Sequence, residues 1–362
     1  MKNRIGKYLG VSIAVGMALS IALDFLSFEG PFPDAVFWFT ILASALGSIH
    51  LVIKKNLFVY VTKRGVEAAV TIFVIATVTF LMLRFLPGGP FDSEKALPPD
   101  VKANIEKKYN LNAPVTEQYT NYIGGLIQGD LGTSYKYIGR DVTTIIGESM
   151  GATFKLGFYS LLLSFLVGIP LGVLAAHKHN TWIDNTAMAT AISGVALPNF
   201  LVGAVLILVF AIHLQVLPAA LWETPAHYIL PVLTLGLRPI SIIARMTRSS
   251  VLDVIKADYV RTAWAKGLDE KVVLFKHVLR NSLVPVLSIS GPLVANVLSG
   301  SFVVEVIFAV PGMGKHLVQS VSNRDYPLIL GLTLLYSVIL ILCNLIVDLL
   351  YSIVDPRIKL SS

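Results

Sequence analysis

The pentapeptide Gly147-Glu148-Ser149-Met150-Gly151 has residue types and a spacing that could perform nucleophilic chemistry. In serine hydrolases the pattern G-x-S-x-G holds a reactive serine on a sharp turn between a strand and a helix. The β-branched residues of 141–146 would supply that strand. However, the polar segment 87–153 is too short for the parallel sheet of such an enzyme, and the downstream histidines lie at or beside apolar runs. A membrane-anchored serine hydrolase acting through Ser149 is therefore the weaker alternative.

Two further segments resemble a nucleotide site and a metal site but lack essential residues. In the run 311–316 (PGMGKH), Ala309 stands where a phosphate-binding loop needs its first glycine, and His316 stands where it needs serine or threonine. His177 and His179 are close enough for a shared metal, but no third ligand is in view, so we interpret them as interfacial residues. The sequence thus predicts a chain with no catalytic residue, no metal site and no cofactor of its own.

The composition is that of a membrane protein. Of the 362 residues, 55% are hydrophobic and only 14% are charged, and the mean hydropathy is +0.72. Soluble domains carry about 25% charged residues. The net charge of +7 does not indicate a nucleic-acid partner, because Lys and Arg gather at the ends of apolar runs, as topology determinants do. The single cysteine, Cys343, lies inside an apolar run and has no partner for a disulfide within the chain.

Eight apolar runs approach or exceed the roughly 20 residues that a helix needs to cross a bilayer. In chain order they are Leu9–Leu26, Ala35–Ile53, Val66–Leu86, Leu156–Ala176, Ala187–Ile212, Tyr228–Ile243, Ser282–Val304 and Leu328–Val347. No A-x-A-like cleavage site follows the first run, so we expect a retained helix rather than a signal peptide. The polar segment 87–153 follows the third run, and its helical spacing at 101–109 predicts that it is folded.

The distribution of basic residues predicts that both termini are cytoplasmic. The short outer connections 27–34 and 213–227 then contain no Lys or Arg, whereas the inner connections contain every dense basic cluster, including the stretch 245–280. The segment 87–153 lies outside, and its lysines do not contradict this, because segments of that length are translocated largely regardless of charge. The sequence predicts a multi-pass protein of the cytoplasmic membrane.

The weakest run, Tyr228–Ile243, contains an arginine between prolines. Pro231, Arg238 and Pro239 interrupt it. A charge at membrane depth normally faces protein or a water-filled cavity. Arg238 would then either line a translocation path, where it could meet a substrate carboxylate, or pair within the bundle, or mark the inner end of its helix.

Three other polar residues are candidates for such a path. Asn199 follows Pro198 and would contribute to a polar break in its helix, which can line the path of a transporter. Glu305 lies at the outer end of a run, either near a gate or at a solvated helix end. Asn296 is the third candidate, within the run that precedes Glu305.

The stretch 245–281 alternates basic and apolar residues and is cytoplasmic in this topology. Residues 257–268 are predicted to form a short helix with one apolar face. The residues of that face are Val260, Ala263, Trp264, Gly267 and Leu268. Gly267 suits a helix C-terminus or a close backbone approach. Taken alone, the helix could lie on anionic lipid, belong to a solvated loop, or dock into a groove of a soluble partner, with Trp264 as the anchor.

At these residues the sequence resembles the permeases of the oligopeptide, dipeptide and nickel ABC importers. The segment DYVRTAWAKG (258–267), followed by HVLRN (277–281), is similar to the coupling loop of that family. Further similar motifs, in chain order, are LRFLPGGP (83–90), GDLGTS (129–134), ALPNF (196–200), EVIF (305–308), PGMG (311–314), RDYP (324–327) and DPR (355–357). Gly89 and Ala196 depart from the family pattern, which usually has Asp and Ser there, and residues 1–53 lie outside the resemblance.

The resemblance implies a fold and its divisions. The expected fold is an all-α polytopic membrane protein with an ABC importer permease-type bundle of about six core transmembrane helices. An N-terminal two-helix hairpin, residues 1–56, would precede the permease domain 57–357, and residues 358–362 would form a cytoplasmic tail. Within the permease domain, 87–153 would be extracytoplasmic and 245–281 would be the coupling loop.

The resemblance also implies the function and the partners. The chain would form half of a translocation pathway for peptides, together with a second permease, two cytoplasmic ATPase subunits that bind the ATP and Mg²⁺, an extracytoplasmic binding protein and membrane lipid. The expected ATPase-coupling residues are Asp258, Tyr259, Arg261, Ala263, Trp264, Lys266 and Gly267. A secondary transporter or channel is the alternative; it would explain the spans and Arg238 but gives no reason for the helix that carries Trp264.

Overall fold

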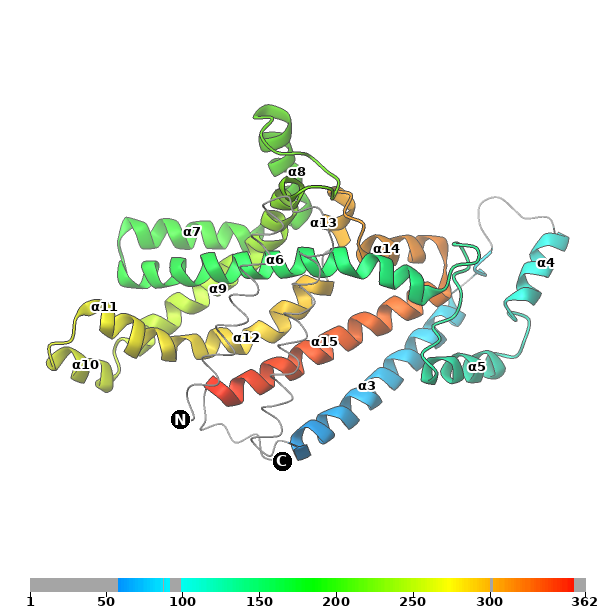
Figure 1. Ribbon diagram of the computed structural model, residues 1–362, viewed down its shortest axis with the longest axis horizontal. Coiled ribbons are helices and arrows are strands. Elements are labelled where there is room, and N and C mark those ends of the chain that lie inside the picture. Colours follow the sequence, from blue (N-terminus) through cyan, green and yellow to red (C-terminus); the bar gives the residue numbers. More distant parts are fainter. Residues whose placement is uncertain (1–57, 87, 92–98, 300–301, 355–362) are drawn as a thin grey trace.

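The computed structural model describes residues 58–86, 88–91, 99–299 and 302–354 (Figure 1). In these ranges the regular elements are all helices, and the one β-type contact is an isolated bridge between Thr133 and Asp141. The expected all-α fold is confirmed. The predicted spans in residues 9–53 and the tail 358–362 lie outside the described residues.

Five helical stretches are long and apolar enough to cross a membrane. They are α3 (Phe58–Phe85), α6 (Val142–His177), α9 (Pro225–Val254), the stretch Glu270–Ile307, which contains α12 (Leu279–Ser299) and α13 (Phe302–Ile307), and α15 (Tyr326–Val354). A sixth span is formed if the bent pair α7 (Trp182–Ala196) and α8 (Asn199–Leu206), the latter continued by the π-helix η1 (Ile207–His213), is counted as one. The described part of the chain therefore contains the expected core of about six spans.

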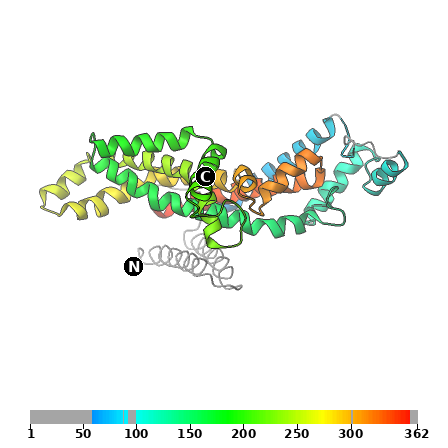
Figure 2. The same ribbon diagram turned by 90° about the horizontal axis from the view of Figure 1, so that it is seen from above.

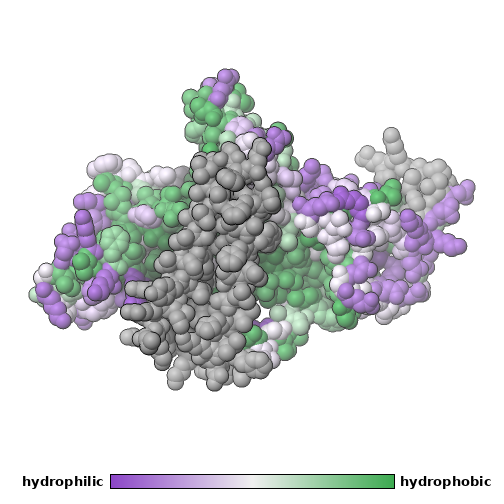
Figure 3. Space-filling model, in the orientation of Figure 1, coloured by the Kyte–Doolittle hydropathy of each residue, from purple (hydrophilic) through white to green (hydrophobic). Residues whose placement is uncertain are grey.

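The long helices lie side by side along the long axis of the molecule, and the polar segments lie at its two ends (Figures 1 and 2). At one end are α10 (Asp258–Ala265) and α11 (Glu270–Val272), which are followed by the π-helix η2 (Val273–Val278). At the other end are α4 (Pro99–Lys108) and α5 (Val115–Ile127). Figure 3 shows hydrophobic surface between these two hydrophilic ends, as expected for a protein that crosses a bilayer.

The central contact of the bundle is between α6 and α9, and it depends on glycines. A Cβ atom at Gly168 would lie 2.9 Å from the carbonyl oxygen of Ile240, and one at Gly172 would lie 2.5 Å from that of Ala244. These positions therefore let the two backbones approach as small residues do between membrane helices. Pro231 and Pro239 lie inside a continuous α9, so the run predicted as weak is in fact one long helix of 30 residues.

One of the predicted spans is a broken helix. The run Ala187–Ile212 corresponds to α7 and α8, which are long enough to cross a membrane only as a pair and which are bent by 110° at the predicted break beside Asn199. Leu197 adopts an extended conformation with ψ of 128°, because the ring of Pro198 disfavours helical geometry in the residue before it. In Figure 1, α8 projects away from the other helices.

The strand that the weaker hydrolase alternative requires at 141–146 is not formed. Residues from Val142 onward form the first turns of α6, and Ser149 lies in that helix with 3% of its surface exposed. Its Oγ donates a hydrogen bond to the backbone carbonyl of Ile145 at 2.8 Å. A buried hydroxyl within a helix is not a nucleophile elbow, so the geometry does not support the hydrolase interpretation.

The polar segment beyond α3 is folded around a buried aspartate. Asp325 is fully buried and accepts hydrogen bonds from the Ser134 hydroxyl and from the backbone N–H of Tyr135 at 3.0 Å. Tyr326 directs its hydroxyl to the carbonyl of Gly88 at 3.4 Å. Three motifs that are far apart in the sequence, 83–90, 129–134 and 324–327, therefore meet at this end of the molecule.

Candidate functional site

The segment 255–278 between α9 and α12, which is predicted to be cytoplasmic and is called the inner loop below, is built on its own small hydrophobic core. Val260 of α10 is fully buried and Ala263 is 4% exposed, and both pack with Val251, Val273 and Val278. The predicted single face of this helix is therefore divided, because one part of it holds α10 against the end of the bundle. In this structure Ala263 is an internal packing residue, and it does not present the contact surface that we expected of it.

The remaining apolar residues of the loop are exposed. Trp264 is 42% exposed and Tyr259 is 45% exposed, and Leu268 and Phe275 lie on the same inner loop, also exposed. The hydroxyl of Tyr259 accepts a hydrogen bond from Asn281 Nδ2 at 2.8 Å, which ties α10 to the start of α12. Large exposed apolar residues on a supported helix are typical of a protein-binding surface.

Gly267 ends α10 in a left-handed conformation. Its φ is +73°, and its N–H donates to the carbonyl of Trp264 at 2.9 Å. The predicted role as a C-terminal stop is confirmed, since glycine adopts this conformation without strain. A Cβ atom at this position would meet no atom of the chain within 4 Å.

The charged residues of the loop face solvent. Asp258, Arg261 and Lys266 are all exposed. Arg261 Nη1 lies 3.8 Å from Asp258 Oδ1, and an exposed pair at this distance adds little stability. These side chains are therefore free to contribute to recognition at the edge of the apolar surface.

An ion pair that the sequence did not predict clamps α7 to α9 near the inner loop. Arg248 binds Asp184 with two hydrogen bonds, Nε to Oδ1 at 2.5 Å and Nη2 to Oδ2 at 2.6 Å. Asp184 is almost fully buried, and His179 Nδ1 lies 3.2 Å from its Oδ2. The only signal in the sequence was an aspartate at the edge of an apolar run, and its partner is 64 residues away.

The two histidines that are close in sequence do not share a ligand site. His179 joins the ion pair of Asp184, whereas His177 Nδ1 lies 3.4 Å from Glu270 Oε1. No group of three His, Cys, Asp or Glu residues in the described part of the chain could hold a metal ion. Both histidines lie near the junction of the bundle and the inner loop, and their interpretation as interfacial residues stays a prediction.

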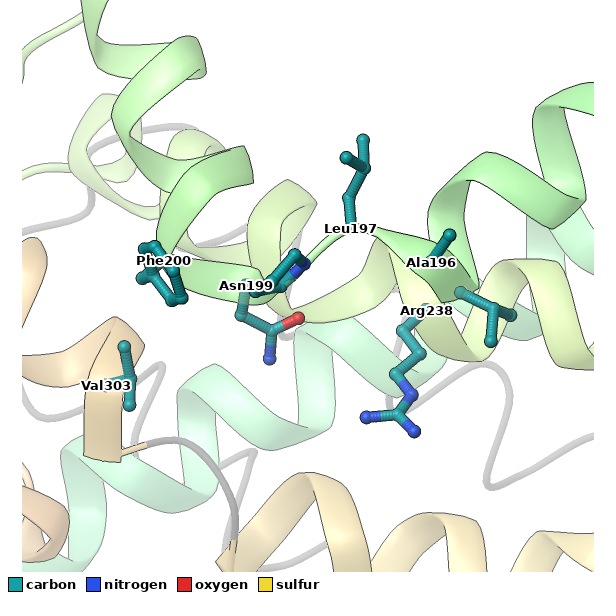
Figure 4. A pocket seen from close by; sticks show the side chains of 8 residues that line it. Ala196, Leu197, Asn199, Phe200, Arg238 and Val303 are labelled. Atoms are coloured by element: carbon teal, nitrogen blue, oxygen red, sulfur yellow. The ribbon is translucent and has the colours of Figure 1, made fainter.

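The break between α7 and α8 opens a pocket of about 390 Å³. Two of the four predicted path residues, Asn199 and Arg238, line it together. Figure 4 shows that the carboxamide of Asn199 and the guanidinium of Arg238 extend from their helices into this space, with Phe200 and Val303 beyond Asn199. The other residues that line the pocket have apolar side chains, so Asn199 and Arg238 supply its polar side-chain groups.

The other two path candidates lie elsewhere. Asn296 is exposed on α12 and does not line the pocket. Glu305 is fully buried, so its interpretation as a solvated helix end is wrong. It accepts hydrogen bonds from Thr153 Oγ1 at 2.9 Å and from the N–H of Gly314 at 2.7 Å.

The run 311–316 forms the start of α14 (Met313–Asn323) and is not a phosphate-binding loop. The Glu305 carboxylate lies at the N-terminus of this helix, where a phosphate would bind in a nucleotide site. Carboxylates are stabilised at that position by the exposed N–H groups and by the helix dipole. Glu305 therefore joins α13 to α14 as a structural group.

The described residues form a bundle of five spans, or six if the bent pair α7 and α8 is one span, with a helix-bearing loop at one end and a pocket at the broken helix. The structure "Inward facing conformations of the MetNI methionine ABC transporter" is similar in fold, with a TM-score of 0.50 at 17% identity, covering 58% of this chain and 96% of that chain. At this identity the likeness shows the fold alone.

Similarity in sequence then shows the family. Residues 57–154 match "Binding-prot-dependent transport system membrane comp, N-term", and residues 168–360 match "Binding-protein-dependent transport system inner membrane component". The dipeptide transport system permease protein DppB of Bacillus subtilis is 44% identical over 301 residues, which are 83% of this chain and 98% of that protein. The oligopeptide transport system permease protein OppB of Salmonella typhimurium is 44% identical over 302 residues, 83% of this chain and 99% of that protein.

The chain belongs to the family of binding-protein-dependent transport system inner membrane components. It is a multi-pass membrane protein and a permease subunit of an ABC importer. The resemblance noted in its motifs is thereby confirmed.

Proposed function

We propose that this permease forms half of the translocation pathway of an ATP-driven importer of peptides. The observation that carries the choice of substrate is the 44% identity, over nearly their whole length, to relatives named as dipeptide and oligopeptide permeases. The partners follow from the architecture: a second permease completes the pathway, an extracytoplasmic binding protein delivers the peptide, and two cytoplasmic ATPases supply the energy.

An importer must alternate between outward-open and inward-open states, and a ligand can shift that equilibrium only if it interacts differently with the two states. We assign this role to ATPases that bind the inner loop, since a separate chain must bind the ATP and Mg²⁺. The surface proposed for docking contains the exposed residues Tyr259, Trp264 and Leu268. Gly267 lies between Trp264 and Leu268 in the sequence. Val260 and Ala263 support this surface from below.

The rigidity of the loop supports its role in transmitting motion. Its buried side chains pack on Val251 near the inner end of α9, and Asn281 at the start of α12 bonds to Tyr259. A force applied to α10 therefore reaches both α9, which carries Arg238, and α12. A solvated loop without these contacts would bend instead of moving the helices.

The test of docking is Gly267→Asp. Because a side chain at this position meets nothing in the chain itself, any loss of function beyond backbone strain must come from a partner that approaches closely. We expect ATP-driven peptide uptake by the assembled transporter to fall about tenfold or more, as for a central interface residue, while the amount of inserted permease is unchanged. ATPase co-purification with the permease should fall as well.

The matched control is Gly139→Asp in the outer segment. Gly139 also has a positive φ, +76°, and a Cβ atom there would meet no atom of the chain within 4 Å, so the substitution introduces similar backbone strain at the opposite end of the molecule. We expect it to retain uptake and ATPase binding. Normal ATPase co-purification and normal uptake in Gly267→Asp would contradict docking at this loop.

Transport assays in proteoliposomes test whether the protein belongs to an ATP-driven importer. A secondary transporter or a channel would move solute without nucleotide, whereas the proposed importer needs all its subunits and ATP. Solute flux at the full rate through this permease alone, without ATPases, would exclude the proposed function.

A further inference from the structure

Arg238 lies near the middle of α9, a helix of 30 residues. Its side chain is exposed, and within the described residues it has no hydrogen-bond or ion-pair partner. A guanidinium at membrane depth is unfavourable in lipid, so it faces protein or a water-filled space in the assembled transporter. This arginine is therefore available to a ligand or to a partner chain.

The pocket at the broken helix has the size and the side chains that a ligand would need. At about 390 Å³ it is within the size range of ligand sites. Arg238 enters it from α9 and Asn199 from the first residue of α8, so two polar side chains from different elements converge on one space (Figure 4). The rest of the lining is made of apolar residues, which include Phe200 and Val303.

The chemistry of the two polar groups fits one end of a peptide. The planar fork of an arginine binds a carboxylate with two parallel hydrogen bonds, and a carboxamide both donates and accepts hydrogen bonds, as peptide groups do. A pathway that admits peptides with different side chains can recognise only what they share, which is the main chain and its charged ends. Of these, only the C-terminal carboxylate complements an arginine.

We propose that Arg238 and Asn199 form a subsite for the C-terminal carboxylate of the peptide as it passes through the permease. The inference rests on the proposed function, since it requires that the substrate is a peptide. Arg238 binds the carboxylate, Asn199 bonds to the last peptide group, and the apolar wall accommodates the last side chain without selecting it.

The test compares peptides with a free and an amidated C-terminus in the assembled transporter with its ATPases, second permease and binding protein. We measure the ratio of their uptake rates for the wild type and for Arg238→Gln. The wild type and Arg238→Gln work with the same binding protein. The ratio for the wild type divided by the ratio for Arg238→Gln, here called the double ratio, therefore reports a difference in the permease alone. Loss of a hydrogen bond to a charged group predicts a change of roughly tenfold or more in this double ratio.

Two further variants show whether the effect belongs to this site. Arg238→Lys keeps the charge but loses the bidentate geometry, so we expect an intermediate double ratio. Arg140→Gln removes the same charge from an exposed pair with Glu148 in the outer segment, where the two side chains are 2.5 Å apart. It should leave the double ratio near one.

Each outcome is decisive. A double ratio near one in Arg238→Gln, with active uptake of peptides by the wild type, overturns the subsite and leaves the proposed function standing. Equal loss of uptake for both peptides points to an ion pair with the second permease, which also overturns the subsite. A wild-type transporter that takes up neither peptide contradicts the proposed function itself.

Discussion

At the scale of single residues, the same type of polar group has different roles according to what surrounds it. Arg238 is a charged residue within one predicted span, and Glu305 is a charged residue at the end of another. Glu305 is enclosed and bonded to Thr153 and Gly314, so its hydrogen-bonding capacity is used inside the fold. Arg238 extends into a pocket without such partners in the described part of the chain. Only the second is positioned to bind a ligand.

His316 provides a pH-dependent test at this scale. It is half-buried on α14 beside the ring of Tyr137, and its Nδ1 has no hydrogen-bond partner in the described structure. Burial, together with the charges of Lys315 and Arg140, lowers the pKa of His316, and Glu148 opposes this only in part. The folded protein therefore favours the neutral imidazole.

The lower pKa of His316 in the folded protein determines how its contribution to stability changes with pH. In the unfolded chain a histidine has a pKa of about 6.5, so its contribution to stability is complete above that pH and is lost as the pH falls through the lower pKa of the folded state. We expect the thermal midpoint of the purified permease to fall between pH 7.5 and pH 5, and to fall less in His316→Gln. An equal fall in both proteins would show that other groups titrate instead.

At the scale of elements, helix packing depends on where glycines stand. Gly172 of α6 lies against Ala244 and Thr247 of α9, whereas Gly151, earlier in the same helix, has no neighbour within 4 Å of a Cβ position. Both glycines lie inside one continuous helix, and the local sequence does not show which of them faces α9. Their surroundings predict opposite effects of the same substitution.

Gly172→Ala should destabilise the permease and Gly151→Ala should not. The new methyl group of the first would lie 2.5 Å from a backbone oxygen of α9, and overpacking of this kind costs about 1–3 kcal/mol. The second gains helix propensity, about 0.5–1 kcal/mol, with no clash. Thermal unfolding of the two variants in detergent measures the difference, and equal midpoints would contradict the packing of α6 on α9.

At the scale of the whole molecule, the inner loop and the outer segment lie at opposite ends of the long axis, and the break between α7 and α8 lies between them (Figure 1). In the proposed importer, the binding protein would deliver the peptide at one end and the ATPases would bind at the other. The long helix α9 connects the pocket to the inner loop, since Arg238 lies in the middle of this helix and Arg248 lies near its inner end.

The proposed orientation in the membrane is testable with single cysteines. Cys343 is the only cysteine of the chain, so Cys343→Ser gives a background without thiols. We expect an impermeant maleimide to label Glu223→Cys on intact cells, and to label Lys271→Cys only after the membrane is opened. Both positions are exposed in the structure. Labelling of Lys271→Cys on intact cells would invert the topology and exclude ATPase docking at the inner loop.

Hydropathy and motif order were enough to locate the core helices, the folded segment between α3 and α6, the helical loop between α9 and α12, and the family. These properties are local, because a span needs only a run of apolar residues and a helix end needs only a residue such as Gly267 that tolerates a positive φ. The same local reasoning also placed Asn199 and Arg238 among the candidates for the pathway. It could not say that they share a pocket.

The tertiary structure alone decided which side chains meet. Asp184 finds Arg248 only because α7 returns along α9, and Glu305 is enclosed only because α14 begins against it. Ala263 is turned inward by the core beneath α10, a contact that helical periodicity does not contain. The physical reason is common to all three: spacing along one helix determines which residues share a face, but the neighbouring helix determines whether that face is core, interface or pathway.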